Sequence, residues 1–418
     1  MALVRLVLYK AKLRSAPPLQ APAVPAPTQA VREGEASALV ELRFQATTPL
    51  RVYSTPAEGV SRVTMITDTI KEGAVYGGVG TAMIMSALIA ENQQRRLRIV
   101  TRIQSPQPSN LDHVLSTYGV MLTRDPEFVF APFYDRRHEM DIFDDELFVT
   151  TSWWTTAAAM ASVAHESVLY LLQEDERMFY PYDDERLRCA QVLESTSIRY
   201  VVNTRLLYDH LVGSGMEHLQ KTGMWFEPAF PASVFHPRPR AVTGKRRFLF
   251  YARPNNVRNL FYFGVDVIEQ AVRRSVLDLE DWDIVLVGKD IPAITFGDGY
   301  VPEKHENLAW QRYAELIGSV DLGLCLMYTP HPSYPPLDLA ASGAVVVTNR
   351  CGNKRDLSGL SRNIVLGNLE RESMLEAMAE GVRLAKDEAR RTANFAANGL
   401  ATDWRSALAE VIAAARRR

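Results

Sequence analysis

Three basic side chains in the C-terminal half of the chain follow strand-like segments and have the chemistry needed to hold a phosphate. Arg253 and Arg258 lie in "ARPNNVRN", after the apolar run "FLFYA" and before a helical pattern, and Lys289 follows "WDIVLVG". A guanidinium offers planar N–H donors that suit phosphate oxygens, and a helix start adds backbone N–H groups and a partial positive charge. The pattern favours phosphate binding about as well as it fits the alternative, a solvated basic loop with a surface lysine.

A second candidate is the segment "HPSYPPLDLAASGAVVVTN", which joins a proline-rich turn, a short helix and a β-branched strand. Ser333 and Tyr334 are predicted to present free backbone N–H groups where this helix starts, because the prolines cannot donate. Asp338 lies among apolar residues of the helix, and burial of an unpaired carboxylate is strongly unfavourable. A ribose-type hydroxyl would be a suitable partner for Asp338. The alternative is an ordinary solvent-facing acid.

Glycines form a third candidate group. Gly77 and Gly78 lie in "YGGVG", which lacks the lysine of a P-loop and the full spacing of a dinucleotide fingerprint. Glycines let a backbone approach a ligand closely, so this loop is predicted to cover a diphosphate from the other side of a cleft. Gly288, which ends "VLVG" directly before Lys289, is assigned to the same binding site.

Two series of alternating strands and helices must position these groups. The first contains the strand-like segments "SRVTMITDTI", "RRLRIVTR", "FVFAPF", "ELFVTTSWW", "SVLYLLQ" and "RYVVNT". The second contains "FLFYA", "WDIVLVG", "VDLGLCLM" and "GAVVVTN". Alternation of this kind is typical of parallel sheets, whose ligands bind outside the carboxyl ends of the strands. The sequence thus predicts an α/β protein with two Rossmann-like, doubly wound domains facing an interdomain cleft.

The expected domain boundaries follow from this alternation and from a proline- and alanine-rich linker, "SAPPLQAPAVPAPTQA". They are an N-terminal extension with the linker (1–59), a first Rossmann-like domain (60–240), a second Rossmann-like domain (241–400) and a C-terminal helix (401–418). The arginines that end the chain are expected to complement the negative end of that last helix.

Bulk composition excludes several classes of protein. The 418 residues are 47% hydrophobic and 23% charged with a net charge of −2, which indicates a globular protein without a nucleic-acid partner. Three scattered cysteines fit neither a disulfide framework nor a zinc site. No apolar run reaches the ~20 residues of a membrane span, and "MALVRLVLYKAKLRSAPP" lacks the features of a signal peptide. The expected location is cytoplasmic, with peripheral contact at the inner face of the plasma membrane as an option. The start of the chain is also compatible with a fragment of a longer polypeptide.

The second domain resembles the retaining GT-B glycosyltransferases. Their "GR-x4-K" signature corresponds to "AR-x4-R" here, with Arg253 and Arg258. Their later acidic motif corresponds to "D-L-A-A-S-G-A-V-V-V", with Asp338 at the second acidic position and Pro330 at the first. That departure removes a carboxylate which lies near the donor sugar in the family, and it puts the sugar contacts in doubt. "GGVGTAMIMSALI" corresponds to the family's glycine loop, but the family's histidine is absent from "FVTTSWWTT".

More narrowly, "ARPNNVRNLFYFG" and "HPSYPPLDLAASG" resemble bacterial rhamnosyltransferases that build S-layer glycans and O-antigens from dTDP-L-rhamnose. The resemblance implies transfer of a sugar from a nucleotide diphosphate to a hydroxyl of a glycan or lipid-linked glycan, without a metal. Arg253, Arg258 and Lys289 would neutralise the leaving diphosphate. Further glycosyltransferase domains upstream of this chain are compatible with the family. No single residue identifies the base or the sugar.

Acceptor recognition is assigned to the first domain. Trp153 and Trp154 are candidates for stacking on sugar rings, and Asp175 in "LLQEDE" for binding hydroxyls. Each is also compatible with an ordinary core or surface position. Two other functions remain open. A non-catalytic saccharide-binding subunit would explain the missing acid. An NAD-dependent dehydrogenase would share the fold, but this sequence lacks the acidic residue that would bind the ribose after the incomplete glycine motif.

Overall fold

The computed structural model describes residues 35–416, apart from 57–58, 72–76, 136 and 239–243. The chain divides into two compact units at Gln45 and Ala46. The first unit contains helix α2 (Ala36–Arg43). The second unit contains everything described below. It includes β1 (Val52–Thr55), which pairs in parallel with β5 (Met140–Phe143), so part of the range predicted as an extension lies in a sheet.

The N-terminal lobe of this unit is built on a seven-stranded sheet in which every pairing is parallel. In spatial order its strands are β4 (Glu127–Phe130), β3 (Arg96–Thr101), β2 (Arg62–Thr67), β6 (Leu147–Thr150), β7 (Val168–Leu172), β8 (Arg199–Asn203) and β9 (Gly223–Phe226). All residues of β2, β6 and β7 are buried, as expected for strands covered on both faces.

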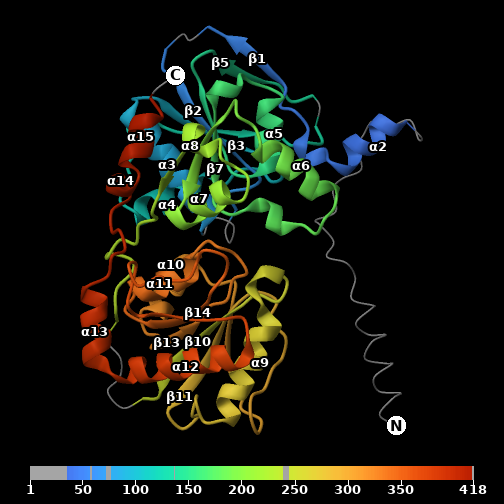
Figure 1. The fold of residues 1–418 in the computed structure, drawn as a ribbon. Helices are drawn as coiled ribbons and strands as arrows, with labels where there is room; N and C mark the ends of the chain where they lie inside the picture. Colours follow the sequence, from blue (N-terminus) through green and yellow to red (C-terminus); the bar gives the residue numbers. More distant parts are fainter. Residues whose placement is uncertain (1–34, 57–58, 72–76, 136, 239–243, 417–418) are drawn as a thin grey trace. The chain divides into compact units, whose positions relative to one another are not determined.

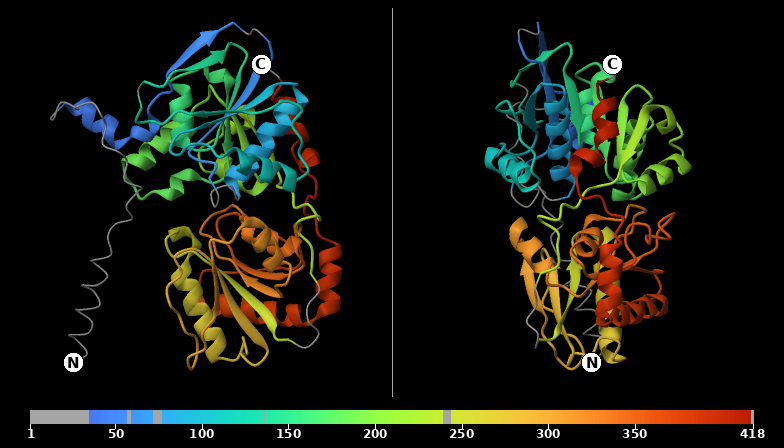
Figure 2. Two further views of the ribbon diagram at one scale, coloured as in Figure 1. Left: turned by 180° about the vertical axis from the view of Figure 1, so that it is seen from behind. Right: turned by 90° about the vertical axis from the view of Figure 1, so that its left-hand side faces the viewer.

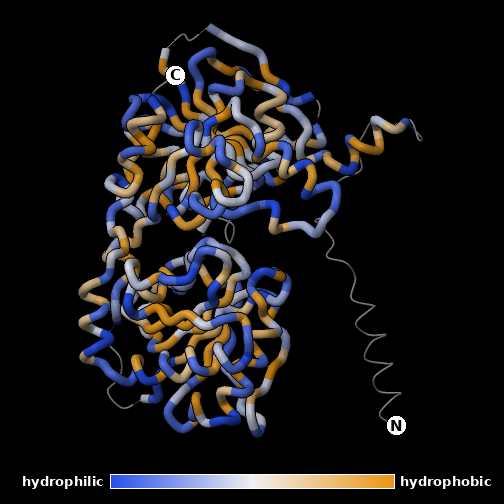
Figure 3. The backbone as a smooth tube through the Cα atoms, viewed as in Figure 1, coloured by the Kyte–Doolittle hydropathy of each residue, from blue (hydrophilic) through white to orange (hydrophobic). Residues whose placement is uncertain are grey.

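Helices on the two faces of this sheet bury separate cores. One core is shared with α3 (Gly78–Asn92) and α4 (Pro108–Thr117). The other is shared with α5 (Trp153–Met160), α6 (Asp184–Leu193), α7 (Arg205–Gly213) and α8 (Leu219–Thr222). Figure 3 shows hydrophobic segments concentrated inside each lobe and hydrophilic segments toward the outside. No helix in the described ranges combines the length and apolar character required to span a bilayer.

The C-terminal lobe repeats the arrangement with six parallel strands. In spatial order these are β12 (Glu303–Glu306), β11 (Trp282–Gly288), β10 (Arg246–Ala252), β13 (Leu322–Leu324), β14 (Val345–Asn349) and β15 (Ile364–Gly367). One face packs against α9 (Phe261–Arg273) and α12 (Arg371–Lys386), and the other against α10 (Trp310–Ile317) and α11 (Tyr334–Ala341). The predicted fold class, two parallel-sheet α/β domains, is confirmed.

In both sheets the strand order reverses beside the first strand, between β2 and β6 and between β10 and β13. A crevice forms at such a switch point because neighbouring connections leave to opposite faces of the sheet. The loop that carries Arg253 follows β10, and the turn that carries Ser333 follows β13. The sheet topology therefore brings these two segments to one edge.

The C-terminal tail returns to the N-terminal lobe. After α13 (Glu388–Ala396) it forms two short helices, α14 (Trp404–Ala407) and α15 (Ala409–Ala414), where one helix was expected. Trp404, Leu408 and Val411 join the core beside α3, so the chain crosses between the lobes twice (Figures 1 and 2). Arg416 donates to the carbonyl of Asn92 at 2.6 Å. The expected role of the last two arginines lies outside the described residues.

Candidate functional site

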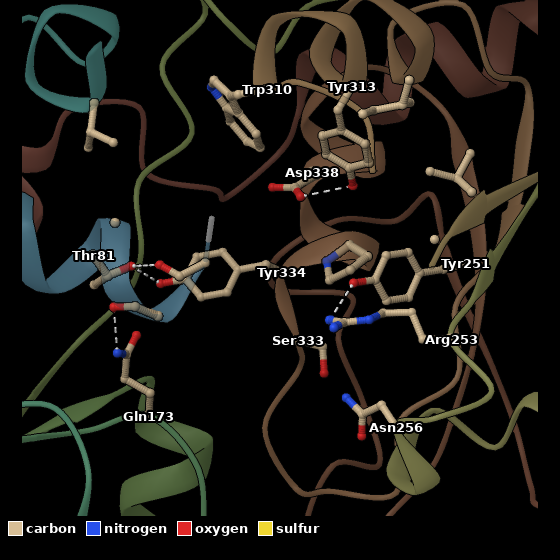
Figure 4. A pocket seen from close by; sticks show the side chains of 18 of the residues that line it. Thr81, Gln173, Tyr251, Arg253, Asn256, Trp310, Tyr313, Ser333, Tyr334 and Asp338 are labelled. Carbon is tan, nitrogen blue, oxygen red and sulfur yellow. Dashed lines mark hydrogen bonds between the residues drawn. The ribbon is translucent and has the colours of Figure 1, made fainter. Parts of the chain in front are cut away.

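A cavity of about 920 Å³ lies between the two lobes, at the carboxyl ends of both sheets. Its walls come from the loops after β2, β7, β10, β11 and β13 and from the first turns of α3 and α11 (Figure 4). The structure brings together nine predicted site residues here: Arg253, Arg258, Lys289, Gly77, Gly78, Gly288, Ser333, Tyr334 and Asp338. Their individual roles in binding or catalysis stay predictions.

Arg253 and Lys289 provide positive charge on the C-terminal side of the cavity. The guanidinium of Arg253 donates to the hydroxyl of Tyr251 at 3.4 Å and points into the cavity near Asn256 (Figure 4). Lys289 is exposed, and its backbone N–H donates to the carbonyl of Ala252 at 3.3 Å. Neither side chain forms an ion pair with another described residue, so both charges are available to an anionic ligand.

Arg258 differs from Arg253 because it already has an acidic partner. Its Nη1 lies 3.3 Å from Oε1 of Glu174, and its guanidinium stacks 4.2 Å from the centre of the Phe179 ring. Glu174 also accepts a hydrogen bond from Thr329. Burial raises the pKa of Glu174, and the charge of Arg258 opposes that shift. A phosphate that binds Arg258 must therefore compete with a carboxylate from the N-terminal lobe.

The turn before α11 corrects one prediction. The backbone N–H of Ser333 is not free, because it donates to Nδ1 of His331 at 2.9 Å. The backbone N–H of Tyr334, the first residue of α11, has no hydrogen-bond partner among the residues that the structure describes. Ser333 itself has a left-handed backbone with φ of 71°, a strained conformation for a residue other than glycine.

Tyr334 links the two lobes through its side chain. Its hydroxyl lies within hydrogen-bond distance of the Thr81 hydroxyl and accepts from the Asn203 amide at 2.8 Å. Asn203 also donates to Gln173, whose amide in turn donates to the carbonyl of Gly78 at 2.8 Å. This network was missed in the sequence. Gln173 and Asn203 follow or end buried parallel strands, and a polar residue in that position is the signal that would have identified them.

Asp338 lies on the C-terminal wall of the cavity and is only 5% exposed. The hydroxyl of Tyr313 donates to its Oδ2 at 3.1 Å (Figure 4). Burial raises the pKa of Asp338 to about 8, and the hydrogen bond from Tyr313 partly opposes the shift. The group is therefore largely uncharged at neutral pH. In that state it can both donate to and accept from a ligand hydroxyl.

The three glycines have structural reasons for being glycine. Gly77 caps α3 with φ of 69°, and a Cβ on Gly78 would lie 3.0 Å from the amide nitrogen of Gln173. A Cβ on Gly288 would lie 1.7 Å from the carbonyl oxygen of Ala252 in the neighbouring strand. Close packing of β10 against β11 thus accounts for Gly288 without any ligand.

The predicted acceptor residues do not line the cavity. Trp153 is 4% exposed and donates its indole N–H to the hydroxyl of Tyr180 at 2.9 Å, and the Trp154 indole donates to Asp68 at 2.9 Å. The segment that contains them starts helix α5 rather than ending a strand, because Ser152 and Thr155 form a capping box.

Asp175 is also engaged within the protein. It accepts two hydrogen bonds from the guanidinium of Arg177, both at 2.8 Å, one from the backbone N–H of Arg177 at 3.2 Å and one from His210 at 3.2 Å. Burial works to raise the pKa of Asp175, but these partners hold it well below its usual range. The N-terminal wall of the cavity is instead formed by Thr69, Lys71, Gln104, His113, Tyr118 and Trp404 among others. Within the described ranges, no three or more His, Cys, Asp or Glu side chains are grouped as a metal site.

Two family matches coincide with the two lobes. Residues 62–197 match the family described as WsaF, N-terminal domain, and residues 246–379 match WsaF, C-terminal domain. The O-antigen biosynthesis protein RfbC of Myxococcus xanthus is 31% identical over 244 residues, which cover 58% of this chain and 18% of that protein. The match thus spans less than a fifth of the length of this relative.

Solved structures of similar fold support the architecture. The Anabaena protein Alr3699/HepE in complex with UDP-glucose has a TM-score of 0.57 and 13% identity, over 84% of this chain and 98% of that one. WaaG, a glycosyltransferase involved in lipopolysaccharide biosynthesis, has a TM-score of 0.56 and 10% identity, over 85% of this chain and 100% of that one. At such identities these likenesses show the fold alone, which is the GT-B fold of glycosyltransferases.

Proposed function

Because this chain contains both domains of the WsaF family, we propose that it is a glycosyltransferase that moves a sugar from a nucleotide diphosphate onto a hydroxyl of a bacterial surface polysaccharide. The observation that carries the proposal is the cavity at the two switch points, with Arg253 and Lys289 on one wall, neither of them ion-paired to another residue that the structure describes. Gly77 and Gly78 lie on the opposite wall. A diphosphate fits between cationic side chains and a glycine backbone.

The proposed reaction needs charge stabilisation more than a strong base. The leaving diphosphate gains negative charge as the bond to the sugar stretches toward an oxocarbenium-like state. Arg253 and Lys289 would stabilise that charge as it develops, which lowers the barrier rather than merely tightening binding. Arg258 would contribute once a ligand displaces Glu174. Asp338, uncharged and hydrogen-bonded to Tyr313, would hold a hydroxyl of the nucleotide's ribose without repelling the diphosphate.

The finer assignment is transfer of L-rhamnose from dTDP-L-rhamnose with retention and without a metal. Its support is the likeness of the segments around Arg253 and Asp338 to those rhamnosyltransferases, together with the similarity to RfbC. Retention would leave the phosphate itself to take the acceptor proton, so the site needs no separate base. Asp338 and the donor groups around it are then concerned with binding.

Calorimetry with dTDP, UDP and GDP tests the proposal directly. We expect one of the three to bind the wild-type protein and Arg253→Ala to weaken that binding. Turnover of the matching nucleotide sugar in the presence of EDTA tests metal independence, and the anomeric configuration of the product by NMR tests retention. Failure of all three nucleotides to bind or to raise the unfolding temperature would refute the proposal and favour a saccharide-binding subunit.

A further inference from the structure

The turn between β13 and α11 holds a histidine in one defined state. His331 lines the cavity and is only 2% exposed. Its Nδ1 accepts the backbone N–H of Ser333 at 2.9 Å, and its own backbone N–H donates to the Thr329 hydroxyl at 3.2 Å. Because Nδ1 is an acceptor, the ring hydrogen of the neutral imidazole lies on Nε2.

The surroundings also keep this ring uncharged. Burial lowers the pKa of His331 to about 3, assisted by the positive charges of Lys354 and Arg258. The ammonium of Lys354 is fully buried and lies 3.4 Å from the carbonyl oxygen of His331. Across the neutral pH range the ring therefore presents one hydrogen-bond donor, Nε2–H, and no charge.

Two buried polar atoms of this turn are left without partners. Neither Nε2 of His331 nor Oγ of Ser333 has a hydrogen-bond partner among the described residues. A buried donor without a partner is energetically unfavourable. Both residues line the cavity, as Arg253 does (Figure 4). The backbone of Ser333 is strained, with φ of 71°.

We propose that Nε2–H of His331 and the hydroxyl of Ser333 hydrogen-bond to the sugar of the nucleotide sugar, so that this turn recognises the transferred sugar rather than the diphosphate. The inference rests on the proposed function. Neutral donors are matched to a sugar hydroxyl or ring oxygen, whereas the positive charges of Arg253 and Lys289 in the same cavity are matched to phosphate. The sugar oxygen that faces His331 must therefore act as an acceptor.

Two substitutions separate the ligand contact from the structure of the turn. His331→Asn keeps an acceptor near the Nδ1 position for the Ser333 N–H but removes the donor at Nε2. His331→Gln places an amide donor near the Nε2 position but loses that acceptor. Each variant is titrated calorimetrically with dTDP and dTDP-L-rhamnose, or with UDP and UDP-glucose if uridine binds the wild-type protein better.

We expect His331→Asn to leave the affinity for the nucleotide unchanged and to lower that for the nucleotide sugar about tenfold, the factor that corresponds to about 1.4 kcal/mol. His331→Gln should recover part of this loss, and Ser333→Ala should show a smaller loss of the same kind. Nitrogen-15 spectra of the histidine rings give a second readout. The Nε2–H signal that disappears in His331→Asn belongs to His331. In the wild-type protein this signal should shift when the nucleotide sugar binds but not when the nucleotide binds.

An equal loss of affinity for nucleotide and nucleotide sugar in His331→Asn would overturn the sugar assignment, and so would an unchanged affinity for both. A wild-type protein that binds none of these probes would instead overturn the proposed function itself. The two failures are thus distinguishable, because only the second is visible without any substitution.

Discussion

Asp338 offers a test of the site's electrostatics that needs no ligand. Burial raises the pKa of this carboxyl from 3.8 to about 8 in the folded protein. Between these two values the native state holds a proton that the unfolded state has released. Stability must then fall as the pH rises, by about 1.4 kcal/mol per pH unit for this one group.

The perturbation is Asp338→Asn, which keeps the shape of the side chain and an oxygen that accepts from Tyr313 but cannot ionise. The titration of other groups is shared by both proteins and cancels in their difference. From about pH 5 to about pH 7 the variant should therefore gain about 3 kcal/mol in unfolding free energy relative to the wild type. Urea unfolding of the two proteins at both pH values measures this difference.

The sign of this effect is specific to a carboxyl that is buried uncharged. A carboxylate stabilised by a positive partner would give the opposite result, because its removal would harm the protein more at neutral than at acidic pH. A difference between variant and wild type that stays constant from about pH 5 to about pH 7 would refute the reasoning. It would show that Asp338 is charged in the native state or reached by water.

The other predictions concern the cations and the sheet. Arg253→Ala should lower kcat/KM by at least about 100-fold with little change in unfolding temperature, and Arg253→Lys should lower it less, as activity assays and thermal melts will show. Glu174→Gln should release Arg258 and tighten binding of the nucleotide about threefold to tenfold by calorimetry; weaker binding would contradict competition between Glu174 and phosphate. Gly288→Ala should prevent folding, because its Cβ would overlap a carbonyl of β10, whereas Gly213→Ala, with nothing within 4 Å, should melt near the wild type.

The sequence predicted the central strands because burial on both faces leaves them continuously apolar. The predicted "WDIVLVG" is β11, and "RYVVNT" contains β8. One edge strand, β12, was missed for the converse reason. Strand β12 is "EKHE", three of whose four residues are exposed, and only pairing with β11 makes it a strand. The local sequence of β12 does not predict that pairing.

The sequence predicted which residues reach the cavity where those residues lie next to the end of a strand. Arg253, Lys289 and Asp338 reach one cavity because β10, β11 and α11 end or begin at the same sheet edge. The pairing of Arg258 with Glu174 was not predictable, because it joins two lobes through residues far apart in the chain. The occupied N–H of Ser333 was missed because its acceptor is the side chain of His331, and neighbouring prolines indicate only which donors are absent.

Burial disfavours the charged form of Asp338, and this effect suits a site that binds an anion. A charged carboxylate on this wall would oppose the field of Arg253 and Lys289, whereas an uncharged one leaves it intact. The neutral ring of His331 acts in the same way, since it offers a donor without adding a charge. In the proposed complex the cavity would separate two tasks: full charges would face a phosphate, and uncharged donors would face hydroxyls. Asp338→Asn should preserve this division, so the variant should gain stability without weaker binding of the nucleotide. Asp338→Lys, by contrast, would add a charge where the structure has excluded one.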